Sequence, residues 1–178
     1  NPKIPVSADQ FSKVVKHDSP QADVPFRNAM GELLWTGHTR PDIAYHVQRL
    51  ASLCNGYDEY SFSLLLQIIK YLHCTIDKGV VLRRSGMPLE RLTLFAYSDA
   101  SHASDPINGR SVSGSIVFLQ DNPVDWSSRP QKTVAVSTGE SDLMVATECV
   151  KDVMLQRHLL CEFSQVNDST RIHLDSGG

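Results

Sequence analysis

The spacing of apolar residues changes near Gly79, and this change constrains the fold more than any other feature of the sequence. Before it, apolar residues recur at Ile43, Val47, Leu50 and Cys54, a spacing of four, three and four that is typical of an amphipathic helix. After it, short β-rich runs alternate with turn-forming residues. We therefore expect a helical first part and an α/β second part.

Three helical segments are expected in the first part. They are predicted in the runs FRNAMGELLW, PDIAYHVQRLASLC and SFSLLLQIIKYLHCTI. Pro41 suits the first position of the second helix. Residues 1–25 are polar and rich in proline, which predicts an arm or linker. Residues 26–78 are then expected to form a small helical unit.

The second part is expected to hold one connecting strand, three further strands, a long helix and a final strand. The strands are predicted in GVVLRR (79–84), LTLFAYSD (92–99), SVSGSIVFLQ (111–120), PVDWSS (123–128) and RIHLD (171–175), and the helix over about 138–162. The turns between the first strands are marked by SGMP, SDPINGR and QDNP.

Composition narrows the class of protein. The chain is 41% apolar and has no uninterrupted apolar run of about 18 residues, so we expect a soluble globular protein and no membrane partner. Its four cysteines form no zinc-ligand pattern and are expected as reduced core thiols, which favours an intracellular compartment. The net charge of −3 argues against electrostatic binding of nucleic acid over a broad surface of the protein.

Acidic residues are concentrated in the second half of the chain. Residues 91–178 hold 7 Lys and Arg against 11 Asp and Glu, whereas residues 1–90 hold 10 against 9. Two explanations stand at this point. The excess acids form a solvated surface, or several of them converge on cations.

Glu140 and Asp142 lie two residues apart at the start of the long helix. On a helical wheel counted from Glu140, the apolar stripe with Cys149, Val150 and Val153 lies between about 180° and 280°, and Asp142 lies near 200°. Asp142 is therefore expected in the middle of the core-facing stripe, and Glu140 on the solvent side. An inward carboxylate needs a hydrogen bond, a proton or a cation; the alternative is that Asp142 only complements the dipole of the first helical turn.

Two more carboxylates come at the ends of predicted strands. Asp99 ends LTLFAYSD and Asp175 ends RIHLD, positions that suit a ligand site in an α/β sheet, although a turn aspartate is the alternative for each. Three converging carboxylates repel one another unless divalent cations lie between them. A pair of Mg²⁺ ions in such a site supports phosphodiester cleavage by an activated water.

The motifs of the second half resemble the ribonuclease H domain of copia-type LTR retrotransposon polyproteins. The likeness lies in YSDASHASDPINGRSVSGSIVFL, VDWSSRPQKTVAVSTGESDLMVATECVKDVMLQRHLL and IHLDSGG. Upstream, FRNAMGELLWTGHTRPDIAYHVQRL and IIKYLHCTIDKGVVL resemble the segment that connects the polymerase palm of that family to its ribonuclease H domain. The resemblance covers about residues 25–178.

The resemblance implies a ribonuclease H-like mixed sheet with helices over 79–178, preceded by a thumb-like connection region over 26–78. It carries the catalytic and metal-binding roles to Asp99, Asp142 and Asp175, with two Mg²⁺ or Mn²⁺ ions as cofactors. The implied partners are an RNA–DNA hybrid and the remainder of a reverse transcriptase polyprotein, in a cytoplasmic virus-like particle or the nucleus. The chain stops before the last metal-binding aspartate of the family, so the domain is expected to be incomplete at its C-terminal end.

Four further residues are expected as nucleic-acid contacts. Arg110, Arg129 and Lys132 flank the predicted sheet edge, where they either meet phosphates or belong to a solvated face, and Ser176 follows the strand-end Asp175. Asp142 is one methylene shorter than the glutamate of the family, which predicts weakened catalysis. The chain is thus expected to be either a weakened ribonuclease H or a non-catalytic, domesticated module that binds nucleic acid or a protein partner.

Overall fold

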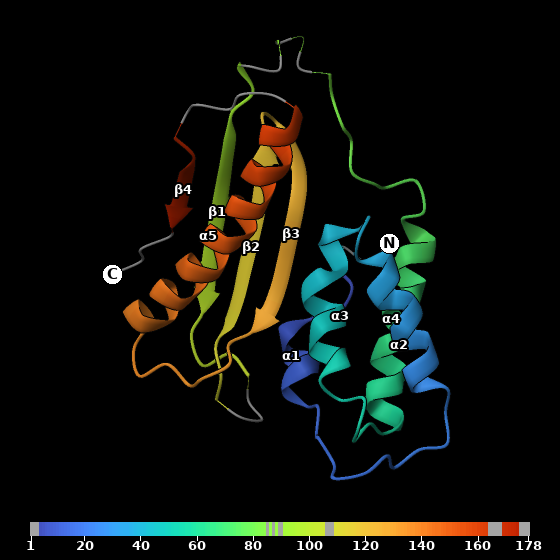
Figure 1. Ribbon diagram of the computed structural model, residues 1–178. Helices are drawn as coiled ribbons and strands as arrows, with labels where there is room; N and C mark the ends of the chain where they lie inside the picture. The colour runs from blue at the N-terminus through green and yellow to red at the C-terminus, as the bar shows by residue number, and fades with distance from the viewer. Residues whose placement is uncertain are drawn as a thin grey trace. The chain divides into compact units, whose positions relative to one another are not determined.

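The computed structural model describes residues 4–84, 86, 88, 91–105, 109–163 and 169–174. The chain divides into two compact units, Asn1–Val80 and Val81–Gly178, which are described separately (Figure 1). Within the described residues, no helix combines the length and the apolar character needed to cross a bilayer.

The N-terminal unit is helical. Its elements are α1 (Ala8–Ser12), α2 (Phe26–Thr36), the 3₁₀ helix η1 (Pro41–Ile43), α3 (Ala44–Ala51) and α4 (Glu59–Cys74). The three helices expected from the sequence are confirmed as α2, η1 with α3, and α4, and Pro41 takes the first turn of η1. The core of the unit is built from the buried faces of these elements, including Phe26, Met30, Ile43, Leu50, Leu65 and Ile68.

Local chemistry explains where α4 begins. The Asp58 carboxylate accepts the Ser61 backbone N–H at 2.8 Å, and the Ser61 hydroxyl oxygen accepts the Asp58 N–H at 2.8 Å. This reciprocal capping pairs two backbone donors at the helix end that would otherwise lack partners. Leu64, Ile68 and Tyr71 then recur at helical spacing on the buried face.

The N-terminal segment differs from the expected arm or linker. Val6 and Phe11 are buried in the core of the helical unit, with exposed fractions of 2% and 4%. The His46 ring nitrogen Nε2 lies 3.0 Å from the Val6 carbonyl oxygen and ties the segment to α3. Two apolar residues among polar neighbours produce no periodic pattern, which is why their burial was not visible in the sequence.

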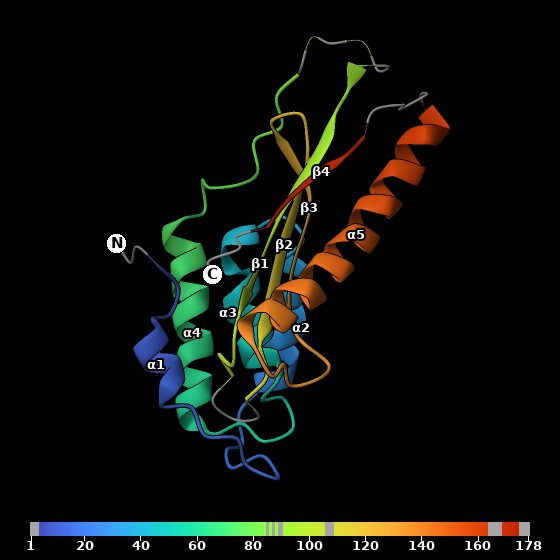
Figure 2. The ribbon, with the colours of Figure 1, turned by 90° about the vertical axis from the view of Figure 1, so that its left-hand side faces the viewer.

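The C-terminal unit is a four-stranded sheet with one long helix. Its elements are β1 (Leu94–Ser101), β2 (Val112–Leu119), β3 (Asn122–Pro130), α5 (Thr138–Phe163) and β4 (Arg171–Leu174). The strand order is β3-β2-β1-β4, with antiparallel pairs β3-β2 and β2-β1 and the parallel pair β1-β4. Figure 2 shows the sheet nearly edge-on, with α5 along one face. This mixed α/β architecture is the expected one and is compatible with a ribonuclease H-like fold.

A compact apolar core joins the sheet to α5. Leu94 and Ala96 of β1 and Val117 of β2 pack against Cys149 and Val153 of α5. Because side chains alternate along a strand, the intervening residues of β1 point to the other face of the sheet. Among the four cysteines only Cys149 is a buried core thiol; Cys54 is half-buried, and Cys74 and Cys161 are exposed.

The prediction of a connecting strand over residues 79–84 is wrong. These residues form no regular secondary structure, and Val81 and Leu82 are 65% and 70% exposed. The Arg83 backbone instead pairs with a side chain: its N–H donates to Asn122 Oδ1 at 2.6 Å, and Asn122 Nδ2 donates to its carbonyl oxygen at 2.9 Å. β-Branched composition predicted an extended backbone but not whether a neighbouring strand would pair with it.

Two glycines of the N-terminal unit provide a matched test of this packing. Gly56 approaches the backbone of His17, whose N–H donates to the Gly56 carbonyl oxygen at 3.1 Å, and a Cβ at Gly56 would overlap the His17 carbonyl group. We expect Gly56→Ala to lower the free energy of unfolding by about 1–3 kcal/mol through overpacking. Urea unfolding followed by the helical circular dichroism signal measures the change.

Gly31 is the control, since it lies within α2 and a Cβ there would meet no atom within 4 Å. We expect Gly31→Ala to raise the free energy of unfolding by about 0.5–1 kcal/mol, because alanine loses less backbone entropy in a helix. Equal effects of the two substitutions would show that the His17 segment is not packed against Gly56.

Candidate functional site

The polar residues singled out in the sequence gather at one end of the sheet. β1 ends at Ser101, and the register pairs Ser101 with Val112 and Val112 with Pro130, so the β1–β2 loop and the end of β3 lie together. Figures 1 and 2 show the first turns of α5 at this same end. β4 runs parallel to β1 toward it, with Leu174 opposite Ser98. We call this region the loop end of the sheet.

Asp99 lies near the end of β1 with an exposed side chain. Its neighbour Ser98 is 5% exposed and shares the buried face with Leu94 and Ala96, so strand alternation turns Asp99 to the face opposite α5. The cross-strand partner of Asp99 is Gly114, which has no side chain to cover the carboxylate.

Asp142 lies beside the buried stripe of α5 and not in its middle. The buried residues of α5 are Ser141, Val145, Cys149 and Val153, each four residues after the last, and Asp142 is half-buried at the edge of that row. The wheel had counted Val150 as core, but its side chain is 41% exposed. The sheet buries a narrower row of the helix than a broad apolar arc suggests.

Buried Ser141 takes the sheet-facing position in the first turn of α5. Its hydroxyl donates to the Thr138 carbonyl oxygen at 2.7 Å, so its burial leaves the hydroxyl proton paired. Glu140 has a structural role there. Its carboxylate accepts the Val136 N–H at 2.7 Å, and its own N–H donates to Ser137 Oγ at 3.2 Å. Glu140 is thus held at the helix start.

The chemistry of the two described acids suits a hard divalent cation. Within the described residues, Asp99 and Asp142 form no hydrogen bond or ion pair through their carboxylates, and carboxylate oxygens are the donors that Mg²⁺ and Mn²⁺ take. No group of three His, Cys, Asp or Glu side chains able to hold a metal is present among those residues. Asp175 and Ser176 lie outside them, so the three-carboxylate site stays a prediction.

The expected nucleic-acid contacts have distinct environments. Arg110 is half-buried in the β1–β2 loop, where its carbonyl oxygen accepts the Asp105 N–H at 3.0 Å. Arg129, at the end of β3, and Lys132, just after it, are both exposed. All three therefore lie at the loop end of the sheet.

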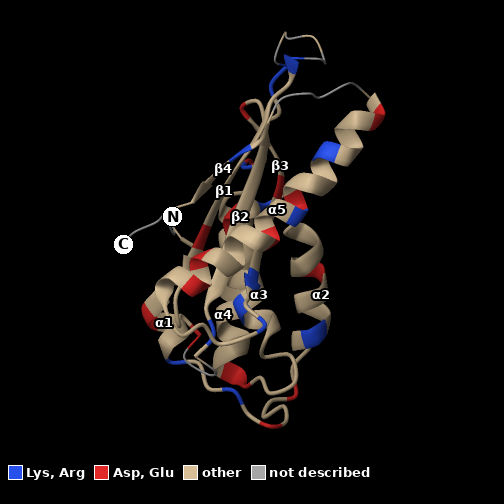
Figure 3. Cartoon of the chain, turned by 60° about the vertical axis from the view of Figure 1, so that its left-hand side comes forward, with Lys and Arg blue, Asp and Glu red and all other residues tan. Residues whose placement is uncertain are grey.

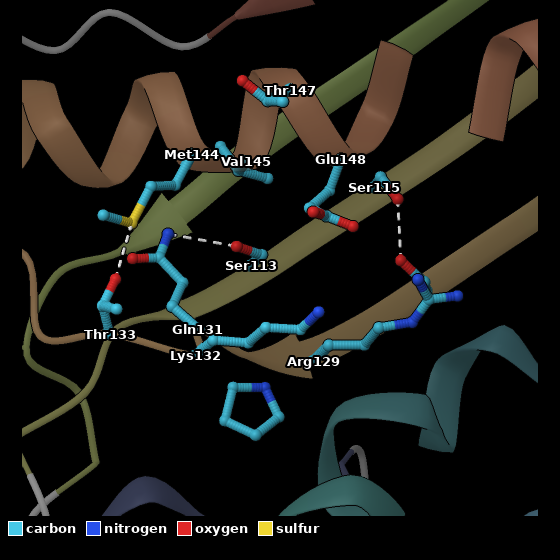
Figure 4. A pocket seen from close by; sticks show the side chains of 12 residues that line it. Ser113, Ser115, Arg129, Gln131, Lys132, Thr133, Met144, Val145, Thr147 and Glu148 are labelled. Carbon is cyan, nitrogen blue, oxygen red and sulfur yellow. Dashed lines mark hydrogen bonds between the residues drawn. The ribbon is translucent and has the colours of Figure 1, made fainter. Parts of the chain in front are cut away.

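A pocket between β3 and α5 was not expected from the sequence. It has a volume of about 280 Å³ and is lined by residues of β2, β3, the loop after β3 and α5, shown in Figure 4. Buried Gln131 is one of the lining residues, and its Nε2 donates to Ser113 Oγ at 3.1 Å and to the Ser141 carbonyl oxygen at 2.8 Å. A polar loop residue between a strand and a helix carries no pattern that distinguishes it from a solvated one.

Charges of both signs lie along α5 (Figure 3). The hydrogen bond that Lys151 Nζ donates to the Glu148 carboxylate lowers the pKa of Glu148, and Lys132 and Arg129 lower it further by smaller amounts. Burial raises the pKa of Asp152, an effect that Arg129 opposes and Asp125 reinforces. The cations beside the pocket thus act on acids of α5, and the charges around the pocket are not uniformly basic.

The raised pKa of Asp152 predicts a pH-dependent stability. The folded chain holds this proton more tightly than the unfolded chain does, so the contribution of Asp152 to the free energy of unfolding falls as pH rises through the ordinary aspartate range, near about 4. Asp152→Asn carries no charge and retains an oxygen to accept the Ser115 hydroxyl. We expect it to gain stability relative to the unsubstituted chain as pH rises from about 3 to 7.

Urea unfolding at several pH values measures this difference. Asp121→Asn is the control, because it removes an exposed carboxylate from the β2–β3 turn of the same sheet. If the gain in the free energy of unfolding from Asp152→Asn is constant with pH, or no larger than the gain from Asp121→Asn, burial does not raise the pKa of Asp152.

The chain is similar to several curated proteins. It is 31% identical over 154 residues to the retrovirus-related Pol polyprotein from transposon RE2 of Arabidopsis thaliana, covering 86% of this chain and 10% of that protein. It is 37% identical over 117 residues to the corresponding polyprotein from transposon RE1 of the same plant, covering 66% and 8%. The chain thus spans about a tenth of the length of these polyproteins.

A shorter relative matches over nearly its whole length. Secreted RxLR effector protein 161 of Plasmopara viticola is 31% identical over 133 residues, covering 74% of this chain and 91% of that protein. No family model matches the chain, and no solved structure matches it significantly. The chain belongs to the same family as this effector, and its homologues include retrovirus-related Pol polyproteins of copia-like transposons.

Proposed function

We propose that the C-terminal unit is a ribonuclease H domain of a retrotransposon Pol polyprotein and cleaves the RNA strand of RNA–DNA hybrids. The observation that carries the proposal is that β1, which bears Asp99, the start of α5, which bears Asp142, and the end of β4 all reach the loop end of one mixed sheet. The similarity to transposon polyproteins supports it, since such elements are named as relatives. The remainder of the polyprotein and the hybrid are the proposed partners.

In this proposal, Asp99, Asp142 and Asp175 would hold two Mg²⁺ or Mn²⁺ ions at the loop end, with Asp99 reaching them from the face of the sheet opposite α5. The ions would supply an activated water and neutralise the leaving oxygen of the phosphodiester. The side chains of the loop end position the substrate. Arg129 and Lys132 are exposed and suited to phosphate contacts, which fix the register of a strand without reading its sequence.

Arg110, half-buried in the neighbouring loop, is suited to orient the backbone near Asp99. The Ser176 hydroxyl is proposed to contact the strand beside Asp175. Contacts to the ribose 2′-hydroxyl distinguish RNA from DNA in such a site.

The length of the Asp142 side chain sets the expected rate. Asp142 lies at the edge of the buried row of α5, and its carboxylate is one methylene closer to the helix axis than that of a glutamate. Displacement of a catalytic group by about 1 Å is able to cost about 10²-fold in rate. We therefore propose weak cleavage by this chain.

The test is cleavage of a labelled RNA–DNA hybrid by the full chain, with Mg²⁺ and with Mn²⁺. We expect Asp99→Asn to abolish cleavage and Asp142→Glu to raise the rate by about tenfold to a hundredfold. Asp121→Asn, which removes an exposed acid from the β2–β3 turn at the other end of the sheet, should leave the rate unchanged. Circular dichroism checks that each variant folds.

No cleavage with either cation, and none restored by Asp142→Glu, would reject the enzymatic proposal for this chain. A second candidate function then gains weight, namely a non-catalytic module with the same fold. It is favoured by the effector relative, a protein of which this chain covers 91% and whose name describes a secreted effector instead of a polyprotein. Folded Asp142→Glu protein that binds a hybrid without cleaving it would support that candidate.

A further inference from the structure

The pocket between β3 and α5, described above, contains an acceptor without a donor. Gln131 is 6% exposed, and within the described residues its oxygen Oε1 is buried with no hydrogen-bond partner. Figure 4 shows this oxygen turned toward Thr133 and Met144 at one side of the pocket. A buried carbonyl oxygen without a donor costs about 1–3 kcal/mol, which a bound N–H or O–H group would recover.

The orientation of the Gln131 amide is fixed by its surroundings. The Ser141 carbonyl oxygen only accepts hydrogen bonds, so the Gln131 atom 2.8 Å from it is the donating nitrogen. Rotating the amide by 180° would place two carbonyl oxygens against each other. The oxygen must therefore point to the side of the pocket, where a ligand donor would reach it once the side chains that cover it move.

The side chains that cover this oxygen are held together by only a weak hydrogen bond. The Thr133 hydroxyl donates to Met144 Sδ at 3.6 Å, and a thioether sulfur is a weak acceptor. Met144 is also flexible and adapts to irregular partners. A ligand group that binds to Gln131 Oε1 thus needs to break only the weak bond between Thr133 and Met144.

Cations and apolar atoms complete the pocket. Arg129 and Lys132 line it from exposed positions, and their influence reaches Glu148 on the opposite wall. Pro130, Met144 and Val145 present apolar surface to the same space. Its volume of about 280 Å³ lies just below the usual range for ligand pockets, roughly 300–1,000 Å³, which suits one small planar group and its anionic neighbour.

We infer that this pocket binds a single nucleotide, with its phosphate at Arg129 and Lys132, its base against Pro130 and Met144, and a base N–H donated to Gln131 Oε1. Every nucleobase carries N–H groups, so the pocket selects a nucleotide and not a particular sequence. The inference rests on the nucleic-acid-binding part of the proposed function and not on cleavage, since Asp99, Asp142 and metal ions take no part in it.

The test is titration of the full chain, in EDTA and low salt, with adenosine monophosphate, ribose 5-phosphate and a single-stranded tetra-adenylate. We expect adenosine monophosphate to bind more tightly than ribose 5-phosphate by about tenfold or more, because the sugar phosphate lacks the base N–H groups and apolar ring. If the mononucleotide binds, the pocket accepts free nucleotides as well as nucleotides within a strand. Binding of the tetranucleotide alone assigns it to a nucleotide within a strand.

Charge-matched variants locate the binding. The double variant Arg129→Gln with Lys132→Gln should weaken binding about tenfold or more, since both substitutions remove charge-assisted contacts to phosphate. Lys16→Gln with Lys70→Gln removes the same charge from exposed positions of the N-terminal unit and should leave the affinity unchanged. Equal losses in the two double variants would overturn the proposal.

Two-dimensional NMR of the Gln131 side-chain amide is the second readout. The two Nε2 protons are held by Ser113 and Ser141, so a new bond at Oε1 should shift their resonances on titration. Binding that leaves these resonances unmoved, or no binding by either nucleotide probe, would overturn the assignment. Cleavage of a hybrid is measured separately, so loss of cleavage with retained nucleotide binding rejects only the catalytic proposal.

Discussion

The C-terminal unit depends on the packing of α5 across the central strands of its sheet. Leu94, Ala96 and Val117 meet Cys149 and Val153 in one apolar layer. Burial of each larger side chain stabilises the unit by about 1.5–3 kcal/mol. Because α5 connects β3 to β4, this layer also sets the crossover that places β4 beside β1 in parallel. The gathering of loops, strand ends and helix start at one end of the sheet follows from this connection.

The core and the candidate chemistry use different faces of the same elements. β1 buries Ala96 and Ser98 toward α5 and exposes Asp99 on the opposite face. Asp142 lies beside the buried row of α5, and no core residue requires its carboxylate. The fold is therefore able to persist when the acids change, and related chains are found both within transposon polyproteins and as a shorter named effector.

The candidate site was only partly accessible from the sequence. The position of Asp99 near a strand end followed from the change from apolar to polar residues along LTLFAYSD and the residues after it. The capping role of Glu140 fits its predicted placement away from the core. Helical periodicity misplaced Asp142 by part of a turn, because an ideal wheel does not include the twist of the sheet that selects the buried row. The pocket at Gln131 had no sequence signal, since its three hydrogen-bonded elements are separated along the chain.

The sequence by itself determined the type and order of the elements: a helical unit, then a mixed sheet with one long helix. Local spacing and caps such as that of Asp58 are sufficient for this, because they act between residues a few positions apart. Only the tertiary structure decided that Val6 and Phe11 join the helical core, that the Arg83 backbone pairs with a side chain, and that Gln131 is buried. The burial of a residue outside a periodic pattern depends on which distant segment comes to lie against it, and that information is absent from its neighbours in the chain.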